Sequence, residues 1–590
     1  MGWDDDKNFL ANFHYRGLGW HELQWMWSTF HLGHYVPLSW MSLGADYLVW
    51  GMNPAGYHAT SLALHVANAT MVYFIARRIF QAALDTPPTA AGEVGARSVA
   101  TRAFPPEFAA AATALLFAVH PLRVESVAWV TERRDVLSGL FYLGAVLSWL
   151  RYCDGSARNR RWYAIALMSA VCAVLSKATA VTLPAVLAVL AFYPLRHTAW
   201  RDGWWSESRK ALYRELAPFA LISASIAALA FVALQHVEQL PVAGKFAVSG
   251  YSIAFYLLKT IVPSGLAPLY AMPLHVDPFA ARYLASGAVV AAICVLAWIS
   301  RRRAPGFAAA WLVFLLVALP LLGVHQNGPQ IAADRYTYNA TIALALLAAS
   351  TLFLVPRQRA VPAVALTSLV IAALMVGTWR QTLIWRDSRS LWTQVLSVEP
   401  DSYIAHNNWA TALMQSDQLD SAAAHYEAAL TISPGYVEAE DNLGVVRARQ
   451  GRFAEAIAHH QRALVLDSMW AGAHNNWGVA LARQGMDSAA VAHFQKALRL
   501  NPEFADAHVN WGNALVRAGH PEEAIEQYRE AVALKPDDAD AHTNWGVALA
   551  RLKRYEEAIE QFRLALVSNP DHADARAYLE RTSQLIRRPD

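Results

Sequence analysis

Between residues 58 and 376 the chain consists largely of apolar segments, each close to the roughly 20 residues that a helix needs to cross the hydrocarbon core of a bilayer. The segments lie at residues 58–80, 105–120, 135–151, 162–177, 179–195, 215–235, 284–300, 306–323, 339–355 and 361–378. This pattern predicts a polytopic membrane domain over residues 58–378 with about ten transmembrane helices.

The composition changes along the chain. Hydrophobic residues make up 55% of the 590 residues and charged residues only 16%, which is far from the average of soluble proteins. The apolar excess lies in the first two thirds, whereas from about Ser397 onward the sequence is rich in alanine, charged and periodic. We therefore expect a membrane domain followed by a soluble domain.

Basic residues gather in alternate loops between the apolar segments. These loops contain Arg77, Arg78, Arg151, Arg158, Arg160, Arg161, Arg196, Arg201, Arg209, Lys210, Arg214, Arg301, Arg302, Arg303, Arg357 and Arg359. The positive-inside rule places them in the cytoplasm. Residues 1–57, the loop 120–135 and everything after Trp379 then share the extracytoplasmic side. Residues 251–270 are expected to be interfacial or re-entrant, because one more crossing there would put Arg301–Arg303 on the wrong side.

Several classes of function are disfavoured by composition. The net charge is only +3 and no basic run suits a phosphate backbone, so nucleic acid is not expected as a partner. Cys153, Cys172 and Cys294 lack the paired spacing of a disulfide framework or a zinc site. The chain also has no secretory signal pattern.

The last third of the chain repeats every 34 residues. The repeated positions are Trp409, Leu443, Trp477, Trp511 and Trp545; Ala422, Ala456, Ala490, Ala524 and Ala558; Tyr426, His460, Phe494, Tyr528 and Phe562; and Pro434, Pro502, Pro536 and Pro570. This period and these residue types are typical of tetratricopeptide helical hairpins. We predict five repeats over 403–572, a linker helix over 379–402 and a capping helix over 573–590.

A column of asparagines has the same period: Asn408, Asn442, Asn476, Asn510 and Asn544. An amide side chain offers an acceptor and two donors, so such a column can bind the backbone of an extended peptide without selecting its side chains. The array resembles the superhelix of nucleocytoplasmic O-linked N-acetylglucosamine transferase, in which an asparagine ladder holds the acceptor polypeptide. The alternative is that these asparagines hydrogen-bond to neighbouring repeats.

Carboxylates stand at the start of the chain, where Asp4, Asp5 and Asp6 follow Trp3. They belong to a predicted extracytoplasmic acidic loop, residues 1–57, in which the Trp-, Tyr- and His-rich stretches suit helices lying in the headgroup layer. An acidic triplet at this place is either a solvated tail or a catalytic loop just outside the bilayer.

Other ionisable residues lie in the outer loops, where charge at membrane depth is costly and suggests function. They are His34, Tyr35, Arg123, Glu125, Arg133, Arg134, Asp135, Lys177, Asp334 and Arg335. Several also have a structural interpretation: Glu125 with Arg123 or Arg133 as an ion pair, Asp334-Arg335 as a helix anchor, His34 as an interfacial hydrogen-bonder and not a metal ligand, and Lys177 as a snorkelling anchor.

The order of these motifs resembles a known family. Trp3-Asp4-Asp5-Asp6, the His34–Leu38 and Asn53–His58 stretches, His120-Pro121 through Glu125, and Asp334-Arg335-Tyr336 precede the repeats. This arrangement is similar to the transmembrane and tetratricopeptide-repeat O-mannosyltransferases and their bacterial relatives, in the GT-C glycosyltransferase superfamily. The resemblance implies an all-α chain with a GT-C-like membrane domain followed by a repeat superhelix.

The resemblance also implies an activity. Such enzymes transfer a sugar, here mannose or another hexose, from a polyprenyl-phosphate donor with inversion to Ser or Thr of polypeptides. In a bacterium this would occur on the periplasmic side of the inner membrane, with the repeat array binding the acceptor. Asp5 is the implied base, with Asp4 or Asp6 assisting it, and Glu125 is the implied catalytic group that orients one of the phosphate contacts. The implied contacts to the lipid phosphate are His34, Tyr35, Arg123, Arg133, Arg134, Lys177 and Arg335.

No cofactor is certain; a divalent cation, Mg or Mn, held by Asp5 and Asp6 is one option. Members of the family have a helix ahead of the acidic loop, whereas only Met1 and Gly2 precede Trp3 here. We therefore expect a truncated start, and the missing helix would raise the number of crossings to eleven. The alternatives to an enzyme are an inactive membrane-anchored repeat scaffold for envelope assembly and a transporter of lipid-linked sugars.

Overall fold

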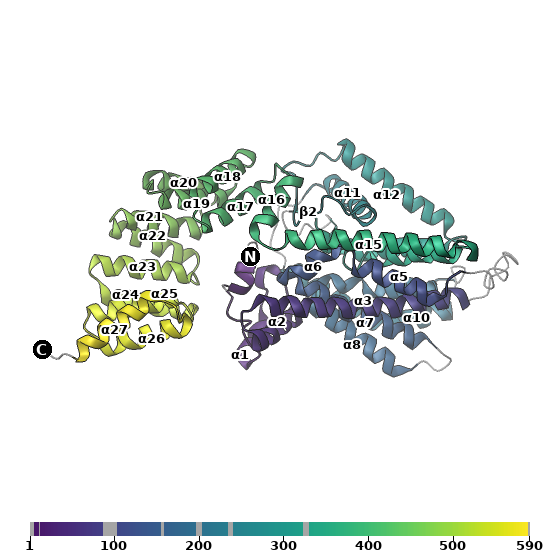
Figure 1. The fold of residues 1–590 in the computed structure, drawn as a ribbon, viewed down its shortest axis with the longest axis horizontal. Coiled ribbons are helices and arrows are strands. Elements are labelled where there is room, and N and C mark those ends of the chain that lie inside the picture. The colour runs from purple at the N-terminus through teal and green to yellow at the C-terminus, as the bar shows by residue number, and fades with distance from the viewer. Residues whose placement is uncertain are drawn as a thin grey trace. The chain divides into compact units, whose positions relative to one another are not determined.

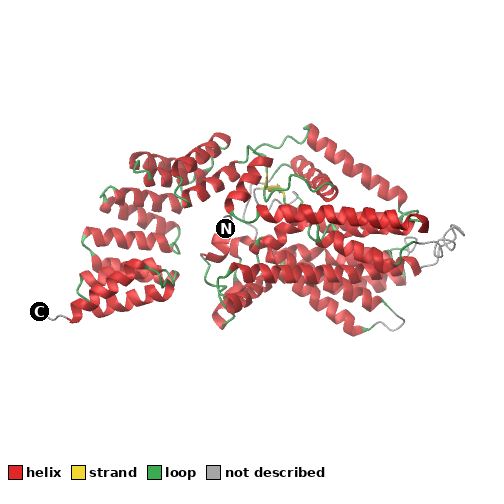
Figure 2. Ribbon diagram, in the orientation of Figure 1, coloured by secondary structure: helices red, strands yellow, loops and turns green. Residues whose placement is uncertain are grey.

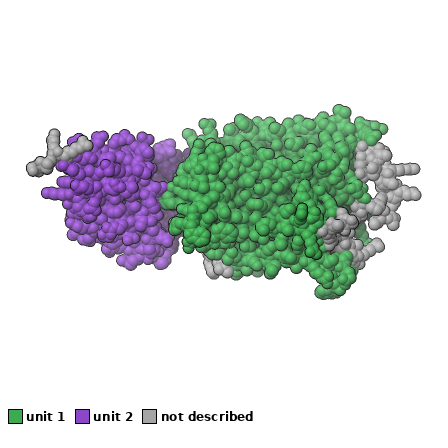
Figure 3. All heavy atoms as spheres, turned by 90° about the horizontal axis from the view of Figure 1, so that it is seen from below, with its two compact units in different colours: residues 1–400 green, residues 401–590 purple. Residues whose placement is uncertain are grey.

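The computed structural model describes residues 5–10, 12–85, 103–154, 159–195, 203–233, 240–322 and 330–587. The chain divides into two compact units, residues 1–400 and residues 401–590 (Figure 3). Helices dominate both units (Figure 2). Among the described residues the only strands are β1 (Tyr270–Ala271) and β2 (Gln330–Ala332), a short antiparallel pair in the first unit. The predicted all-α class is confirmed.

The first unit begins with short helices and continues with long ones (Figure 1). Up to the middle of the unit they are η1 (Asp6–Leu10), α1 (Trp20–Ser28), η2 (His31–Gly33), α2 (Pro37–Trp50), α3 (Pro54–Asp85), α5 (Pro106–Ala118), η3 (Pro121–Arg123), α6 (Val124–Ala128), η4 (Val130–Glu132), α7 (Arg133–Cys153), α8 (Arg160–Ser176), η5 (Ala178–Thr182) and α9 (Leu183–Phe192). The rest are α10 (Glu207–Ala233), α11 (Val242–Ile261), α12 (Ala281–Ser300), α13 (Pro305–Ala318), η6 (Leu319–Leu321), η7 (Asp334–Thr337), α14 (Ile342–Ser350), η8 (Thr351–Leu354), η9 (Arg357–Arg359), α15 (Ala360–Ile384) and α16 (Ser388–Val398).

Many of these helices suit a membrane. Within the described ranges, five helical segments are long and apolar enough to cross one: Pro54–Asp85, Val130–Cys153, Glu207–Phe231, Ala281–Ser300 and Arg357–Ile384. The pair Pro106–Ala118 and Pro121–Ala128, bent by 56°, is a sixth candidate, and three shorter apolar helices accompany them. A helix lies at every predicted apolar segment. The first unit thus has the helices of a multi-pass membrane protein; the number of crossings, the orientation and the role of residues 251–270 stay predictions.

A break in one helix brings charged residues inward. α5 ends at Ala118, and Pro121 cannot donate a backbone hydrogen bond to continue it. His120 Nδ1 instead accepts from the Leu122 N–H (3.3 Å), so the chain restarts as η3 and α6 in a new direction. Arg123 and Glu125 lie on this second piece and are both buried.

The segment η7 is held against α3 and α7 by buried polar contacts. Tyr338 directly follows η7, and its hydroxyl lies 2.8 Å from His65 Nδ1 and accepts from Asn68 Nδ2 (2.9 Å). Asn68 also donates to the Val136 carbonyl (2.8 Å). A Cβ at Gly139 would lie 2.9 Å from the Tyr338 ring, so only glycine leaves room for this approach. Because these contacts fix the end of η7, they also fix the position of Arg335 within it.

The second unit is a series of helical hairpins (Figure 1). They are α17 (Tyr403–Gln415) and α18 (Leu419–Ile432), α19 (Val437–Arg449) and α20 (Phe453–Leu466), α21 (Ala471–Arg483) and α22 (Asp487–Leu500), α23 (Ala505–Ala518) and α24 (Pro521–Leu534), and α25 (Ala539–Arg551) and α26 (Tyr555–Ser568), followed by α27 (Ala573–Arg587). A Cβ at Gly478 would lie 2.6 Å from the Phe494 ring, and Gly512 has the same relation to Tyr528. The repeat pattern thus encodes close packing within each hairpin.

One repeat-like helix was missed by the sequence analysis. Trp392 in α16 and the following Pro400 stand 34 residues before Tyr426 and Pro434. Trp392 is buried like the ring residues of the later repeats. The segment predicted as a linker helix therefore contains the second half of a further repeat, and the period itself would have revealed it.

Candidate functional site

A cluster of buried charges forms around Glu132 in the first unit. The Glu132 carboxylate, fully buried at the end of η4, accepts from Arg134 (2.7 Å) and Lys177 (3.1 Å) and forms an ion pair with Arg335 (3.2 Å). These cations come from α7, from the turn after α8 and from η7. Glu132 therefore joins three separate parts of the chain.

Two further carboxylates complete this cluster. Glu125 accepts from the Arg335 backbone N–H (2.8 Å) and forms an ion pair with its guanidinium. Asp135 accepts from Lys177 (2.6 Å) and from the Ser126 hydroxyl (3.2 Å). Glu125, Glu132, Asp135, Arg134, Lys177 and Arg335 are called the charge cluster below. Its three cations balance its three carboxylates among the described side chains.

The side chains of the charge cluster differ in how far they are exposed. The side chains of Glu125 and Glu132 are the deepest groups, with exposed fractions of 2% and 0%, and Asp135 is exposed by 9%. Two cations of the charge cluster lie nearer the surface, with 17% for Arg134 and 12% for Lys177, and Arg335 is exposed by 7%. The two most exposed members, Arg134 and Lys177, are thus paired with a fully buried carboxylate, Glu132. This arrangement can bind an anion that approaches from outside.

His34 lies at the edge of the charge cluster. Much of the residue is exposed. The nearby positive charge of Arg134 and, second, the desolvation of the imidazole by the surrounding protein lower the pKa of His34 to about 3. Its imidazole is therefore neutral at ordinary pH and can both donate and accept a hydrogen bond.

The structure places Asp5 beside the charge cluster. Its Oδ1 accepts from the Trp129 indole N–H (3.1 Å) and from the Thr131 hydroxyl (2.8 Å), and the residue is buried. The Arg335 guanidinium carbon lies 5.2 Å from the centroid of the Trp129 ring. One tryptophan therefore contacts both the predicted base and a predicted phosphate contact. Asp4 and the Asp6 side chain lie outside the described residues.

Asp334 and Arg123 lie next to the charge cluster. The Tyr270 hydroxyl donates to Asp334 (3.1 Å), and burial together with the negative charge of Glu125 raises the pKa of Asp334 well above its usual value. Arg123 donates to the hydroxyls of Thr337 (2.9 Å) and Thr341 (2.7 Å). Its Nε and Nη1 have no hydrogen-bond partner among the described residues.

Two predicted phosphate contacts, Arg133 and Tyr35, do not belong to the charge cluster. Arg133 is buried in another network, where it forms an ion pair with Asp46 (2.7 Å) and donates to the Tyr57 carbonyl (2.7 Å) and the Ser61 hydroxyl (2.9 Å). Tyr35 donates to the Trp27 carbonyl (3.1 Å). The Arg133 contacts join α2, α3 and α7, so they explain this residue structurally.

Glu132, Trp129 and Asp46 were missed as site or network residues. The sequence offered a signal for the first two, because both lie in the outer loop that contains Glu125 and the Arg-Asp pair at 134–135. No such signal exists for Asp46, because the residues next to it in the sequence do not indicate that Arg133 packs there.

The asparagine column of the repeats makes contacts between neighbouring hairpins. Asn442 donates to Asn407 (3.2 Å), Asn476 to Asp441 (3.1 and 3.2 Å) and Asn510 to Asn475 (3.0 Å). Asn408 accepts from Asn407 (3.2 Å). Among the described residues Asn544 has no such partner, because Val509 stands where the earlier repeats have a polar side chain. These bonds use only part of each amide, so peptide binding stays a prediction.

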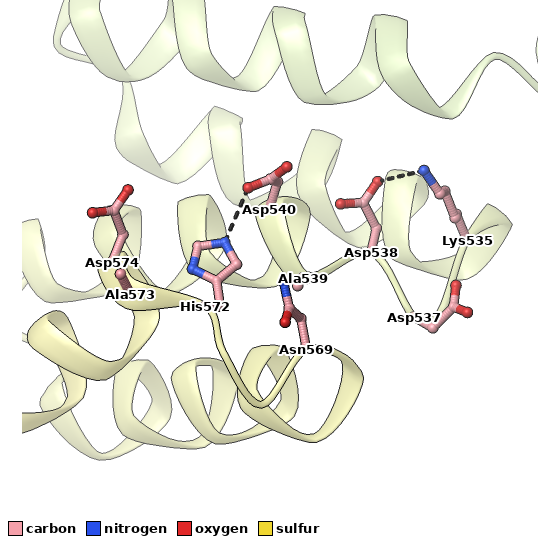
Figure 4. A pocket seen from close by; sticks show the side chains of 9 residues that line it. All are labelled: Lys535, Asp537, Asp538, Ala539, Asp540, Asn569, His572, Ala573 and Asp574. Carbon is pink, nitrogen blue, oxygen red and sulfur yellow. Dashed lines mark hydrogen bonds and ion pairs between the residues drawn. The ribbon is translucent and has the colours of Figure 1, made fainter. Parts of the chain in front are cut away.

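A hollow in the last repeats is lined by acidic side chains (Figure 4). Two of them are paired, Asp538 with Lys535 (3.1 Å) and Asp540 with His572 (3.0 Å). In the part of the chain that the structure describes, no group of three or more His, Cys, Asp or Glu side chains could hold a metal ion. The cation at Asp5 and Asp6 stays a prediction, since the Asp6 side chain lies outside that part.

Comparisons with known proteins agree with this architecture. Residues 384–437 and 509–573 match a family model described as tetratricopeptide repeat, and so do residues 441–468 and 471–504 with two further models. The C-terminal part of the chain is a tetratricopeptide-repeat array. Similar solved structures include YrrB, a tetratricopeptide protein with an unusual peptide-binding site (25% identity, 32% of this chain and 97% of that chain, TM-score 0.25), and a thermophilic tetratricopeptide protein of Thermus thermophilus (22% identity, 31% and 100%, TM-score 0.29).

The curated relatives are named protein O-mannosyl-transferases. Tmtc1 of Drosophila melanogaster is 32% identical over 152 residues, which are 25% of this chain and 14% of that protein. The protein tmtc2 of Xenopus laevis is 30% identical over 26% of this chain and 16% of its own length, and human TMTC1 is 29% identical over 27% and 17%. The chain thus spans less than a fifth of these relatives. The predicted resemblance to this family is confirmed over about a quarter of the chain.

Proposed function

We propose that the protein is a membrane glycosyltransferase that transfers a hexose, such as mannose, from a polyprenyl-phosphate donor to Ser or Thr hydroxyls of a polypeptide on the extracytoplasmic side. The observation that carries this proposal is the cluster of cations, Arg134 and Lys177 partly exposed, that is held by buried carboxylates, with Asp5 bonded to the same loop. The similarity to proteins named O-mannosyl-transferases supports the reaction class.

The cations supply the binding site for the leaving group. Arg134, Lys177 and Arg335 would contact the donor phosphate, whose negative charge grows as the bond to the sugar breaks. Glu125, Glu132 and Asp135 fix the positions of these cations before the donor arrives. Since the charge cluster is neutral without a ligand, the phosphate would bind through the orientation of the cations and their hydrogen bonds, and not through a net positive charge.

Asp5 would act as the general base. It would take the proton of the acceptor hydroxyl while the hydroxyl oxygen attacks the anomeric carbon, and the bond from that carbon to the phosphate oxygen would break on the opposite side. Polyprenyl phosphate leaves and the configuration at the anomeric carbon inverts. The two donors on Oδ1, from Trp129 and Thr131, hold the carboxylate in one orientation. No step of this scheme uses a metal ion.

The repeat array would bind the acceptor polypeptide. An extended peptide presents alternating backbone donors and acceptors, which the remaining donor and acceptor capacity of the asparagine column can match. The polypeptide class of the acceptor rests on this column and on the names of the relatives.

The test is a transfer assay in lipid nanodiscs with a polyprenyl-phosphate hexose and a Ser/Thr-containing peptide. We expect transfer by the wild-type chain and a loss of about a hundredfold or more in kcat for Asp5→Asn. Asp401→Asn, an exposed carboxylate outside the site, is the control. Unchanged turnover of Asp5→Asn would refute the base assignment, and failure of every donor with the wild type would favour the scaffold alternative.

A further inference from the structure

A row of arginines runs along the first helices of the repeat hairpins. It has the same 34-residue period as the asparagine column and begins one repeat later: Arg449, Arg483, Arg517 and Arg551. All four residues are exposed, and each lies in the last turn of its helix, α19, α21, α23 or α25. These four residues are called the arginine row below.

The arginine row lies on the same face of the repeats as the asparagine column. Each arginine follows the asparagine of its own helix by seven residues, which is two helical turns and a distance of about 10 Å. Helical side chains lean toward the N-terminus of their helix, so each arginine leans toward its asparagine. The six residues between them include no acidic residue in any of the four helices. An extended chain on the asparagine column would therefore have the arginine row beside it.

The helix dipole does not explain the arginine row by itself. A cation in the last turn stabilises any helix through this dipole, which is the structural explanation of such a residue. The same explanation applies to the second helices of the hairpins, α18, α20, α22, α24 and α26. Of these five described helices only α22 has a basic residue in its last turn, Arg499. The recurrence of arginine in the first helices therefore has a further reason.

Successive first helices are neighbours, so the arginine row is regularly spaced (Figure 1). Arg449 donates to the Met414 carbonyl (2.8 Å), which belongs to the preceding first helix, and Arg551 donates to the Val516 carbonyl in the same way (2.9 Å). Packed helices lie about 10 Å apart, and a polyproline II chain repeats its side-chain direction every three residues, about 9 Å. Carboxylates at every third residue of such a chain would therefore meet successive arginines.

The arginine row can accept further carboxylates. Arg449 pairs with Asp417 and Arg517 with Asp487, both at 2.9 Å, but these arginine side chains are 42% and 47% exposed. Exposed pairs of this kind contribute little to stability, so a ligand carboxylate can replace the partner. Arg483 has neither an ion pair nor a side-chain hydrogen bond in the part of the chain that the structure describes. A guanidinium has five donors, so the arginines that bind a carbonyl also keep free capacity.

We propose that the repeat array binds extended polypeptides with Asp or Glu at every third residue, whose carboxylates lie on the arginine row while their backbone lies on the asparagine column. An arginine offers a carboxylate two parallel donors, so the row adds selection by side chains to a column that binds only the backbone. The inference rests on the proposed function, because that function makes this polypeptide the acceptor. Acidic segments would then be preferred over neutral ones.

The first experiment measures binding of three fluorescent peptides to the full chain in nanodiscs of neutral lipid, without a donor. The spaced peptide has Glu at every third position, the neutral peptide has Gln there, and the block peptide has the same number of Glu residues side by side. We expect the spaced peptide to bind about fivefold more tightly than the other two at low salt, and less so at high salt.

Two outcomes of this experiment would overturn the proposal. One is equal affinity for the spaced peptide and either of the other two. The other is displacement of the spaced peptide by phosphatidylglycerol vesicles and not by its own unlabelled copy, which would assign the arginine row to a lipid surface. Because no donor is needed, a preference for the spaced peptide in a chain that transfers no sugar would refute the proposed function and leave this inference standing.

The second experiment removes part of the arginine row. The double variant Arg483→Gln/Arg551→Gln should bind the spaced peptide about threefold more weakly or worse, with unchanged affinity for the neutral peptide. Arg499→Gln removes an exposed cation from the last turn of a second helix and is the matched control, expected to change neither affinity. Weaker binding of both peptides by the double variant would indicate damage to the array and contradict the assignment. An equal loss for Arg499→Gln would contradict it too, because the attraction would then be unspecific.

Discussion

Both units of this protein bury polar side chains, but they arrange them in opposite ways. In the first unit, residues from distant segments converge at one place, the charge cluster. In the second unit, paired polar residues recur along the array: His406 with His425 (2.9 Å), Glu440 with His459 (2.7 Å), His474 with His493 (3.2 Å), His508 with Gln527 (2.9 Å) and His542 with Gln561 (2.8 Å).

This difference suggests different roles for the recurring pairs and for the charge cluster. A pair that recurs in every hairpin has the same neighbours each time, so it is part of the repeat's packing. The charge cluster occurs once, and its members have no local reason to be charged. Burying ion pairs costs desolvation energy that apolar residues would not incur. This contrast supports the proposed function of the converging charges and a structural role of the recurring pairs.

The largest effect is expected at the centre of the charge cluster. Glu132→Gln removes the carboxylate that three cations share, so those cations would repel one another in a buried place. Breaking a buried ion pair typically costs about 3–5 kcal/mol, so the first unit should unfold at a clearly lower temperature and transfer should be lost. Thermal unfolding in nanodiscs measures this. Glu557→Gln, which breaks an exposed pair with Arg554 in the repeats, should leave the unfolding temperature unchanged. Similar shifts for both variants would contradict the contrast between the two units.

The histidine pairs of the repeats should respond to pH instead. Burial, with the charges of Lys496, His493 and Arg499, lowers the pKa of His474 to about 4, and the pKa of His493 is lowered too, mainly by burial. Unfolded histidine titrates near 6.5, so below that pH the unfolded chain binds more protons. Stability is therefore present above pH 6.5 and is lost as the pH falls toward 4, by up to about 1.4 kcal/mol per pH unit for each such histidine.

Replacing one member of the pair tests this explanation. His493→Gln reproduces the His508–Gln527 pair of another repeat and removes the histidine neighbour. Denaturant unfolding of the full chain between pH 4 and 7, followed by helical signal, should show a shallower loss of stability for the variant. The same pH profile in the variant and the wild type would show that the pairs do not set it.

The repeat fold could be predicted from sequence, and the charge cluster only in part. The 34-residue period imposes one environment on each position, so the small residue Ala490 and the ring of Phe494 are expected from the repeat pattern, and both are buried in the hairpin. In the first unit Lys177 and Arg335 were recognised as candidates because charge near apolar segments is rare. Their common partner Glu132 was not, because the bend after Ala118 and the fixing of η7 by Asn68 decide which groups meet.

A smaller effect is expected at Trp129, which links Asp5 with Arg335. Trp129→Phe keeps an aromatic ring beneath the guanidinium and removes the N–H that orients Asp5. Loss of one such hydrogen bond, about 1–1.5 kcal/mol, should lower kcat about tenfold with little change in KM for the donor. Trp385, stacked on Trp129 at 6.0 Å, is the control, because its indole N–H has no partner among the described residues. Equal losses in kcat for Trp129→Phe and Trp385→Phe would show that packing, and not the bond to Asp5, is responsible.

The smallest effect distinguishes the two roles of the asparagine column. Asn544 has no hydrogen bond to a neighbouring repeat among the described residues, whereas Asn510 donates to Asn475 (3.0 Å). Asn544→Ala should therefore weaken binding of an extended acceptor peptide by a few-fold to tenfold, since one net hydrogen bond contributes about 0.5–1.5 kcal/mol, and leave unfolding unchanged. Asn510→Ala should weaken binding by the same factor and also lower stability. Peptide affinity of the full chain, measured by fluorescence anisotropy, checks both variants. If Asn544→Ala binds peptide as the wild type does while Asn510→Ala only loses stability, the column holds the repeats together and the peptide binds elsewhere on the array.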